Sequence, residues 1–179
     1  MRRRYTRTAM LLHWLMALLI IGTFSLGLYM SDLVLSPRKL QLFAYHKWIG
    51  MALLGLWTLR VLWRTSHQPP ALSTTLPLWQ IRAANLTHLT LYVLLFTTPM
   101  TGWLMSSAYG FRVVMFGVWP LPNLIDINHA LGGQLKSIHS LLNDGLLGLV
   151  GLHLLAVIQH QFILRDGLLW RMWPWGGKK

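Results

Sequence analysis

The sequence contains no cysteine and no glutamate, and charged residues make up only 11% of it. Without cysteine the chain cannot form disulfides, ligate an iron–sulfur cluster through thiolates, or attach haem covalently through a C-x-x-C-H motif. The absence of glutamate also excludes an H-E-x-x-H zinc motif. Soluble domains contain about a quarter charged residues, so the low charge argues against a soluble fold.

Four apolar runs have the length needed to cross a bilayer. Hydrophobic residues make up 54% of the chain, and most prolines and charges fall between the runs. Pro99 and Gly102 lie inside the third run and are expected to bend its helix. We therefore predict an all-α, integral membrane four-helix bundle, a single membrane domain over residues 1–179 with spans near 10–30, 43–63, 82–107 and 136–163.

The formal net charge of +12 predicts a membrane orientation rather than a nucleic-acid surface, because the basic residues flank the apolar runs. Under the positive-inside rule the end with more basic residues is cytoplasmic, so both termini are predicted to lie in the cytoplasm. The eleven basic residues assigned to that end are Arg2, Arg3, Arg4, Arg7, Arg60, Arg64, Arg82, Arg165, Arg171, Lys178 and Lys179. The five at the outer end are Arg38, Lys39, Lys47, Arg112 and Lys136.

Histidine is the most informative residue type, because an imidazole in hydrocarbon is costly unless it is bonded or ligating. His139 and His153 lie on the fourth run, on nearly the same helix face and about 21 Å apart along its axis. His46 begins the second run at the outer level of His139, and His13 lies in the first run at the inner level of His153. A haem in electron transfer takes one axial ligand on each side of the iron. We therefore predict His46 with His139 at an outer haem, and His13 with His153 at an inner one.

Other roles for the histidines remain open at this stage. Any of them can serve as an interhelical hydrogen-bonding group, and zinc is a weaker alternative because the two pairs are too far apart for one site. His160 returns to the same face as His153 and is an alternative inner ligand. We expect His88 and His160 to bind a haem propionate or a quinone, to support the ligands, or to lie simply at the interface.

The chain resembles the bacterial cytochrome b561 proteins, which are related to the cytochrome b subunits of nickel–iron hydrogenases and formate dehydrogenases. The resemblance covers nearly the whole chain and rests on short motifs in a fixed order. These are His13-Trp14, His46, Ala84-Asn85-Leu86-Thr87-His88, Lys136-Ser137-Ile138-His139, Gly151-Leu152-His153 and Leu168-Leu169-Trp170-Arg171-Met172-Trp173-Pro174.

The resemblance implies a multi-pass protein of the bacterial inner membrane with two noncovalent haems b, held by His13 with His153 and by His46 with His139. One free-standing type in the family oxidises superoxide at the outer face and reduces ubiquinone. The size of this chain and its closing motif look more like that type than like the longer hydrogenase subunits. The sequence departs from the family pattern at Asp144, where a neutral residue is expected.

Basic residues near the predicted outer haem are candidates for guiding an anion. Lys136 lies one turn before His139 and is the first choice for guiding superoxide, with Lys47 and Arg112 beside it. The alternative is that these cations only neutralise haem propionates. Asp144 lies deeper in the same run, and it is either a functional acid or one bonded to a neighbouring helix.

Quinone reduction needs an apolar slot and a source of protons, and we expect the slot where Pro99 and Gly102 bend the third helix. His88, His160 or Asp166 would relay protons on the inner side. The predicted activity is one-electron oxidation of superoxide coupled to reduction of ubiquinone. The expected partners are membrane lipid, ubiquinone and superoxide, and no nucleic acid is expected to bind. The main rival is an electron-transfer subunit that docks a separate dehydrogenase or cytochrome, and a haem-free structural or transport protein is the third reading.

Overall fold

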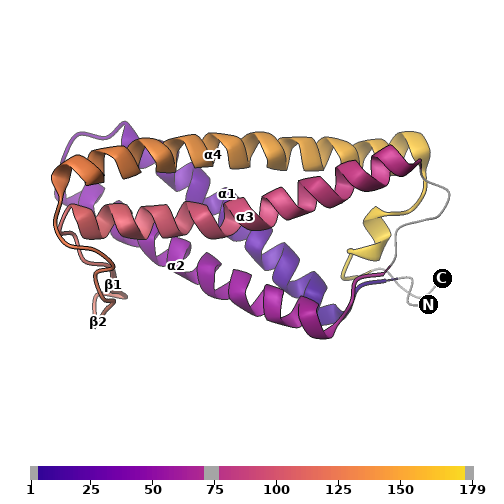
Figure 1. Cartoon of the computed structure of the whole chain (residues 1–179), viewed down its shortest axis with the longest axis horizontal. Coiled ribbons are helices and arrows are strands. Elements are labelled where there is room, and N and C mark those ends of the chain that lie inside the picture. The colour runs from indigo at the N-terminus through magenta and orange to yellow at the C-terminus, as the bar shows by residue number, and fades with distance from the viewer. Residues whose placement is uncertain (1–3, 71–76, 176–179) are drawn as a thin grey trace.

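A computed structural model describes residues 4–70 and 77–175. Its four long helices are α1 (Arg7–Ser31), α2 (Pro37–Ser66), α3 (Leu78–Ala108) and α4 (His129–Ile158). They run alternately in opposite directions, so that the start of α1 and the end of the described chain lie at the same end of the bundle (Figure 1). We call this the terminal end, and the opposite end, with the α1–α2 and α3–α4 links, the outer end.

Three helices begin at polar caps that lie before the apolar runs. Side-chain oxygens of Thr6, Ser36 and Asn128 accept hydrogen bonds from backbone N–H groups at the starts of α1, α2 and α4. The helices therefore start earlier than the predicted spans, by three to seven residues. The difference has a simple cause, because hydropathy marks the part that crosses hydrocarbon whereas caps mark where the helix begins.

Three helices are long and apolar enough to cross a membrane: α1, α3, and α4 together with its extension to Leu164. Helix α2 has 30 residues, but its apolar stretch between Lys47 and Arg60 is confined to residues 48–59. Within the described residues the helical prediction is thus confirmed as four long helices, whereas three of them, rather than the four predicted, have the composition of a span.

The helices pack in sequence order, α1 against α2, α2 against α3, and α3 against α4. Within the described residues neither α1 nor α2 packs closely against α4. Helix α3 contains Pro99 and bends along its length (Figure 1), as expected where a proline removes a backbone donor. Contact between α4 and the helices α1 and α2 is therefore made by long side chains, because their backbones do not approach closely.

A small antiparallel hairpin follows α3 at the outer end. Strand β1 (Val114–Met115) pairs with β2 (Trp119–Pro120), and the chain then returns across the end of α3 to α4. At the other end, α4 continues as a π-helix, η1 (Gln159–Leu164), and a short 3₁₀ helix, η2 (Leu169–Arg171), follows. Hydrogen bonds from Tyr5 N to Arg171 O (3.2 Å) and from Trp14 Nε1 to Met172 O (2.8 Å) attach this closing segment to α1.

Candidate functional site

The outer histidine pair is brought together as predicted. His46 on α2 and His139 on α4 face each other with ring centroids 6.3 Å apart and ring planes at 83°. Their helices do not pack closely, so the two imidazoles span the space between α2 and α4.

Hydrogen bonds fix which nitrogen of each outer ring is free. His46 Nδ1 lies 3.1 Å from the carbonyl oxygen of Thr23, and His139 Nδ1 lies 3.0 Å from that of Thr98. A carbonyl oxygen only accepts, so Nδ1 of each ring must carry the hydrogen and donate it. The lone pair then lies on Nε2, which is the arrangement that a backbone carbonyl imposes on a metal-ligating histidine.

Two glycines allow neighbouring helices to approach the outer rings. A Cβ at Gly27 of α1 would lie 3.3 Å from Cε1 of His46, and one at Gly102 of α3 would lie 3.1 Å from Cε1 of His139. Both separations are shorter than ordinary van der Waals contact. The glycines therefore leave room for the ring orientation that the threonine carbonyls set.

The inner pair is also brought together, at the terminal end. His13 on α1 and His153 on α4 have ring centroids 6.4 Å apart and ring planes at 78°. His88 on α3 lies beside them, with its centroid 5.7 Å from that of His153. His153 thus has two histidine neighbours, and α1 and α4 are bridged at this level as α2 and α4 are at the outer one.

The centroid separations of both pairs are compatible with two imidazoles on one metal ion. A metal–imidazole bond of about 2.0–2.1 Å, with the centroid roughly 1.1 Å behind the nitrogen, places two opposed centroids about 6.3 Å apart. The predicted pairs match this distance, at 6.3 and 6.4 Å, better than His88 with His153 does at 5.7 Å. Within residues 4–70 and 77–175 there is no group of three or more His, Cys, Asp or Glu residues that could hold a metal ion. Two opposed imidazoles suit a metal whose other ligands come from a porphyrin, so the residues present fit haem.

A model of the prokaryotic cytochrome b561 family matches residues 4–175. The chain belongs to the prokaryotic cytochrome b561 family. Proteins of this family bind haem b, and the family resemblance predicted from the histidine motifs is confirmed. This cytochrome b561 is a bacterial membrane protein involved in electron transport.

Curated relatives of this cytochrome b561 match over nearly their whole length. "Cytochrome b561 homolog 2" of Escherichia coli K12 is 33% identical, covering 94% of this chain and 90% of the relative. "Probable superoxide oxidase CybB" of Yersinia pestis is 28% identical, covering 97% and 98%. "Cytochrome b561 homolog 1" of Escherichia coli K12 is 25% identical, covering 96% and 97%.

The outer basic residues of this cytochrome b561 differ in their surroundings. Lys136 is exposed one turn from His139, and it makes no hydrogen bond or ion pair with any described residue. Arg112 is likewise exposed. Lys47, in contrast, donates to the carbonyl oxygen of Phe111 (3.3 Å) and lies over its ring. Lys47 therefore holds the outer segment, which is the link between α3 and α4 (residues 109–128). The side chain of Lys136, in contrast, is available to an anion.

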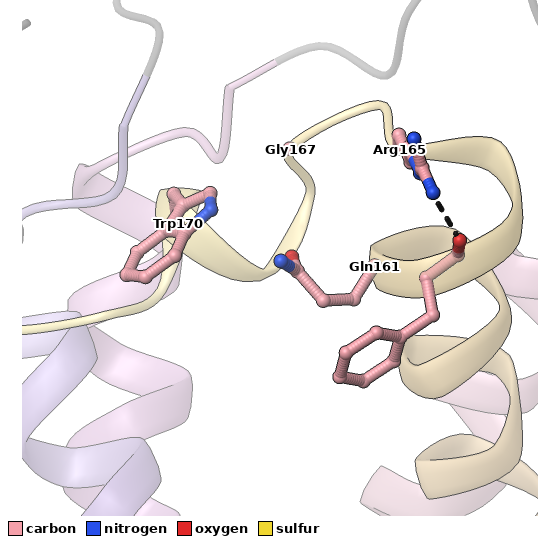
Figure 2. A pocket seen from close by; sticks show the side chains of 5 residues that line it. Gln161, Arg165, Gly167 and Trp170 are labelled. Carbon is pink, nitrogen blue, oxygen red and sulfur yellow. Dashed lines mark hydrogen bonds between the residues drawn. The ribbon is translucent and has the colours of Figure 1, made fainter.

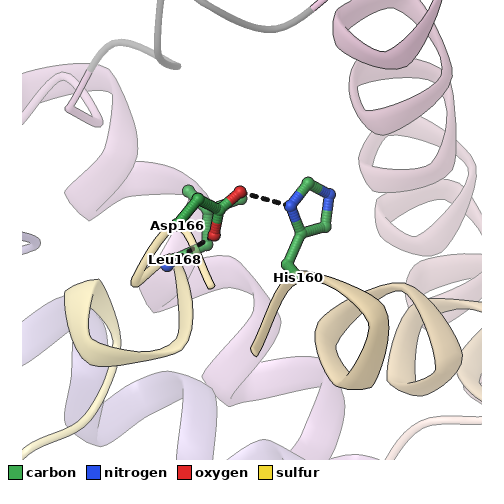
Figure 3. Close-up of polar contacts among 3 residues, drawn as sticks. All are labelled: His160, Asp166 and Leu168. Atoms are coloured by element: carbon green, nitrogen blue, oxygen red, sulfur yellow. Dashed lines mark hydrogen bonds and ion pairs between the residues drawn. The ribbon is translucent and has the colours of Figure 1, made fainter. Parts of the chain in front are cut away.

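An acid–imidazole pair lies at the terminal end of α4. His160 Nδ1 lies 2.5 Å from Oδ2 of Asp166 (Figure 3). Oδ1 of the same carboxylate accepts from Leu168 N at 3.1 Å, so Asp166 is held in place by the turn that follows η1. Sequence reasoning named both residues as proton carriers, and the structure brings them together.

A hollow lies beside this pair, between η1 and η2. It is lined by Gln161, Phe162, Arg165, Gly167 and Trp170 (Figure 2). The side-chain oxygen Oε1 of Gln161 is buried and has no hydrogen-bond partner among the described residues. Phe162 and Trp170 are more than half exposed, so the hollow combines a polar atom that has no described partner with exposed apolar walls. The π-helix, a form often found at functional sites, was not predicted from sequence.

Two expectations need correction. Gly102 lies against the His139 ring, so this bend of α3 serves the outer histidine pair rather than an open quinone slot. Asp144 is exposed and makes no hydrogen bond or ion pair with the described residues, so the alternative that it is bonded to a neighbouring helix is wrong. Sequence reasoning also missed Thr23 and Thr98. Their backbone carbonyl oxygens accept the hydrogen bonds from the histidine rings, and every residue type has such an oxygen.

Proposed function

We propose that this cytochrome b561 holds two haems b and is a superoxide:ubiquinone oxidoreductase of the bacterial inner membrane. The observation that carries the proposal is the pair of opposed imidazoles at each of two levels, with centroids 6.3 and 6.4 Å apart. His46 with His139 would hold one haem, and His13 with His153 the other. Bound there without covalent links, the haems would supply one-electron redox chemistry.

The overall reaction balances without another reactant. Two superoxide anions each lose one electron and leave as two molecules of O₂, while one ubiquinone takes up two electrons and two protons to form ubiquinol. The protein must therefore admit a small anion at one end and deliver protons at the other.

We assign the admission of superoxide to the outer end. Lys136 is exposed and unpaired among the described residues, and it lies one turn from His139 on the same helix. A cation at the mouth of a low-dielectric site raises the local concentration of a small anion. Arg112 adds a second exposed positive charge at this end, whereas Lys47 is already engaged with Phe111.

We assign quinone reduction to the hollow between η1 and η2. His160 follows His153 by seven residues, which is about 10 Å along a helix, so the hollow lies close to the inner histidine pair. The Nε2–H group of Gln161 can donate to a quinone ring carbonyl, and its Oε1 can accept from a quinol hydroxyl, with Phe162 and Trp170 as apolar walls. The His160–Asp166 pair would supply the protons, because an imidazole can take up and release a proton and the carboxylate holds this ring in place.

The basic residues set the orientation that this reaction needs. Most lie at the terminal end, which the positive-inside rule places in the cytoplasm; Arg2, Arg3, Lys178 and Lys179 of that set lie outside the described residues. Superoxide would then be oxidised at the periplasmic side, and quinone protons would come from the cytoplasm.

A haem-to-protein ratio with an optical spectrum tests the haem assignment. The purified chain should contain two haems b, and His139→Ala or His13→Ala should each retain one. His88→Ala is the matched control, because it removes a neighbouring imidazole that we do not assign as a ligand, and it should retain two. A chain that stays colourless when supplied with haem, or an H139A variant that keeps both haems, contradicts the assignment.

A superoxide-dependent quinone reduction assay on the lone purified chain tests the donor. Ubiquinol should form when superoxide is generated, and it should not form when superoxide dismutase is added first. The relative that is 33% identical is named only as a cytochrome, so the docking-subunit alternative stays in view. A haem-loaded chain that ignores superoxide would favour that alternative.

A further inference from the structure

The tip of the β1–β2 hairpin is apolar and exposed. Phe116, Val118 and Trp119 are 72%, 84% and 73% exposed, and residues 113–125 contain no charged side chain. An exposed loop in water is normally polar, and contiguous exposed apolar groups mark an interaction surface. We call these three residues the hairpin tip.

The backbone at the tip is held in a costly conformation. Phe116 and Gly117 both have positive φ, at 54° and 73°, as in the turns that close tight hairpins. Glycine accepts this readily, but a bulky residue such as phenylalanine does so only at a cost. The turn thus presents a phenylalanine outward where a glycine or an asparagine would be less strained.

The hairpin is fastened to the flank of α2. Trp48 Nε1 donates to the carbonyl oxygen of Val114 (2.6 Å), and the Trp48 ring lies 5.3 Å from that of Phe116. Trp48 lies about 16 Å along α2 from its first residue, Pro37, at 1.5 Å per residue. The hairpin root is therefore level with the start of the apolar stretch of α2, residues 48–59, and not beyond the outermost turn of the helix.

Figure 1 shows the hairpin standing off the side of the bundle at the outer end, rather than extending along the helix axes. Sideways from a membrane-spanning bundle lies lipid, whereas a water-soluble partner would approach along the axes. Pro120 and Pro122 have no backbone N–H, which leaves fewer unpaired donors on the returning segment.

We propose that the hairpin tip inserts into the membrane–water interface at the outer end of the bundle and acts as an interfacial anchor, with lipid covering Phe116, Val118 and Trp119. Tryptophan and phenylalanine are the side chains that favour this interface. The anchor holds the outer segment against α2, beside the outer histidine pair. This inference concerns lipid contact alone and does not depend on the proposed reaction.

The absence of native cysteine allows a direct test in the haem-loaded full chain, reconstituted in phospholipid nanodiscs. Val118→Cys places a thiol at the tip, and Asp126→Cys places a matched control thiol at an exposed position of the same segment. An unchanged optical spectrum establishes that each variant is folded. A charged methanethiosulfonate reagent should modify Cys at position 118 on the order of ten-fold more slowly than at 126, because interfacial lipid excludes it.

A second measurement uses an environment-sensitive fluorophore on the same two positions. A nitroxide carried on lipid should quench the label at position 118 on the order of three-fold more than at 126, and iodide in water should show the reverse order. Val118 is exposed in the protein itself, so protection there can come only from lipid. Equal modification rates at the two positions, or equal quenching by iodide, would show that the tip lies in water and would overturn the proposal. The tip would then be available to a soluble partner instead of lipid.

Discussion

At the scale of single residues, the outer histidine pair depends on groups that carry no chemistry of their own. The carbonyl oxygens of Thr23 and Thr98 fix the tautomers of His46 and His139. Such outer partners orient metal-ligating histidines and raise their basicity. Gly27 and Gly102 provide the space in which the rings take this orientation.

Gly102→Ala should weaken the outer haem site. The added methyl carbon would lie 3.1 Å from Cε1 of His139, which pushes the ring away from the position set by Thr98. We expect haem content to fall toward one per chain, or the low-spin signal of one haem to shift in electron paramagnetic resonance. Gly148→Ala is the control, since a Cβ at Gly148 meets nothing within 4 Å, and a result identical to the control would refute this role for Gly102.

Asp166→Asn should slow quinone reduction while leaving both haems in place. The substitution keeps the shape of the side chain but removes the negative charge beside His160 Nδ1. We expect the rate to fall on the order of ten-fold, as for the loss of support to a proton donor. Stopped-flow reduction of ubiquinone measures this rate. Asp144→Asn is the control, because Asp144 is an exposed acid with no described partner. Equal rates in the two variants would exclude a proton role for His160 and Asp166.

At the scale of elements, polar contacts hold α2 at two levels. Arg60 donates to the hydroxyl of Tyr92 on α3 (3.0 Å) and to the carbonyl oxygen of Ala9 on α1 (3.3 Å). Nearer the outer end, Trp48 donates to the carbonyl oxygen of Val114 on β1. These bonds tie α2 to its neighbours, and they explain how a helix with a short apolar stretch takes its place in the bundle.

Trp48→Phe should loosen the hairpin without disturbing the helices. Loss of the indole N–H removes one hydrogen bond, worth about 1 kcal/mol, or roughly a five-fold change in opening equilibrium. Hydrogen exchange of residues 111–121 should rise by about that factor, measured by mass spectrometry. Trp57→Phe is the matched control, because it removes a similar bond to Tyr92 O far from the hairpin. If residues 111–121 exchange hydrogen at the same rate in both variants, the Trp48 hydrogen bond does not hold the hairpin.

At the scale of the whole molecule, charge is distributed unevenly about a bundle of net charge +12. Most of it lies at the terminal end, so the few exposed cations at the outer end act locally on an approaching anion. Salt screens such steering, with a Debye length of about 8 Å at physiological ionic strength.

Lys136→Gln should lower the rate of superoxide oxidation and flatten its dependence on ionic strength. Pulse radiolysis over a range of salt concentrations measures both quantities. Arg82→Gln removes an exposed charge at the terminal end and should leave the salt profile unchanged. A K136Q variant with the wild-type salt profile would instead support a role limited to neutralising propionates.

The spacing of histidines along the apolar runs was enough to predict that His13 meets His153 and that His46 meets His139, at two levels. Their role as haem ligands stays a prediction. His139 and His153 share a helix face because fourteen residues are nearly four turns. Depth pairs His46 with His139, whereas at the inner level it favours His153 as the partner of His13 but leaves His160 as an alternative. Helical periodicity is a local property, so it can be read without knowledge of the packing. The same holds for the long helices of the described chain, three of which are apolar enough to cross a membrane.

Only the tertiary structure decided which side chains surround the ligands and what lies at the two ends. Gly102 had been assigned to a quinone slot, yet it lies against His139 because of how α3 crosses α4. The meeting of His160 with Asp166 depends on the π-helix and the left-handed Arg165 that follows it. Such contacts arise from the relative placement of segments, which hydropathy and spacing along one chain do not specify.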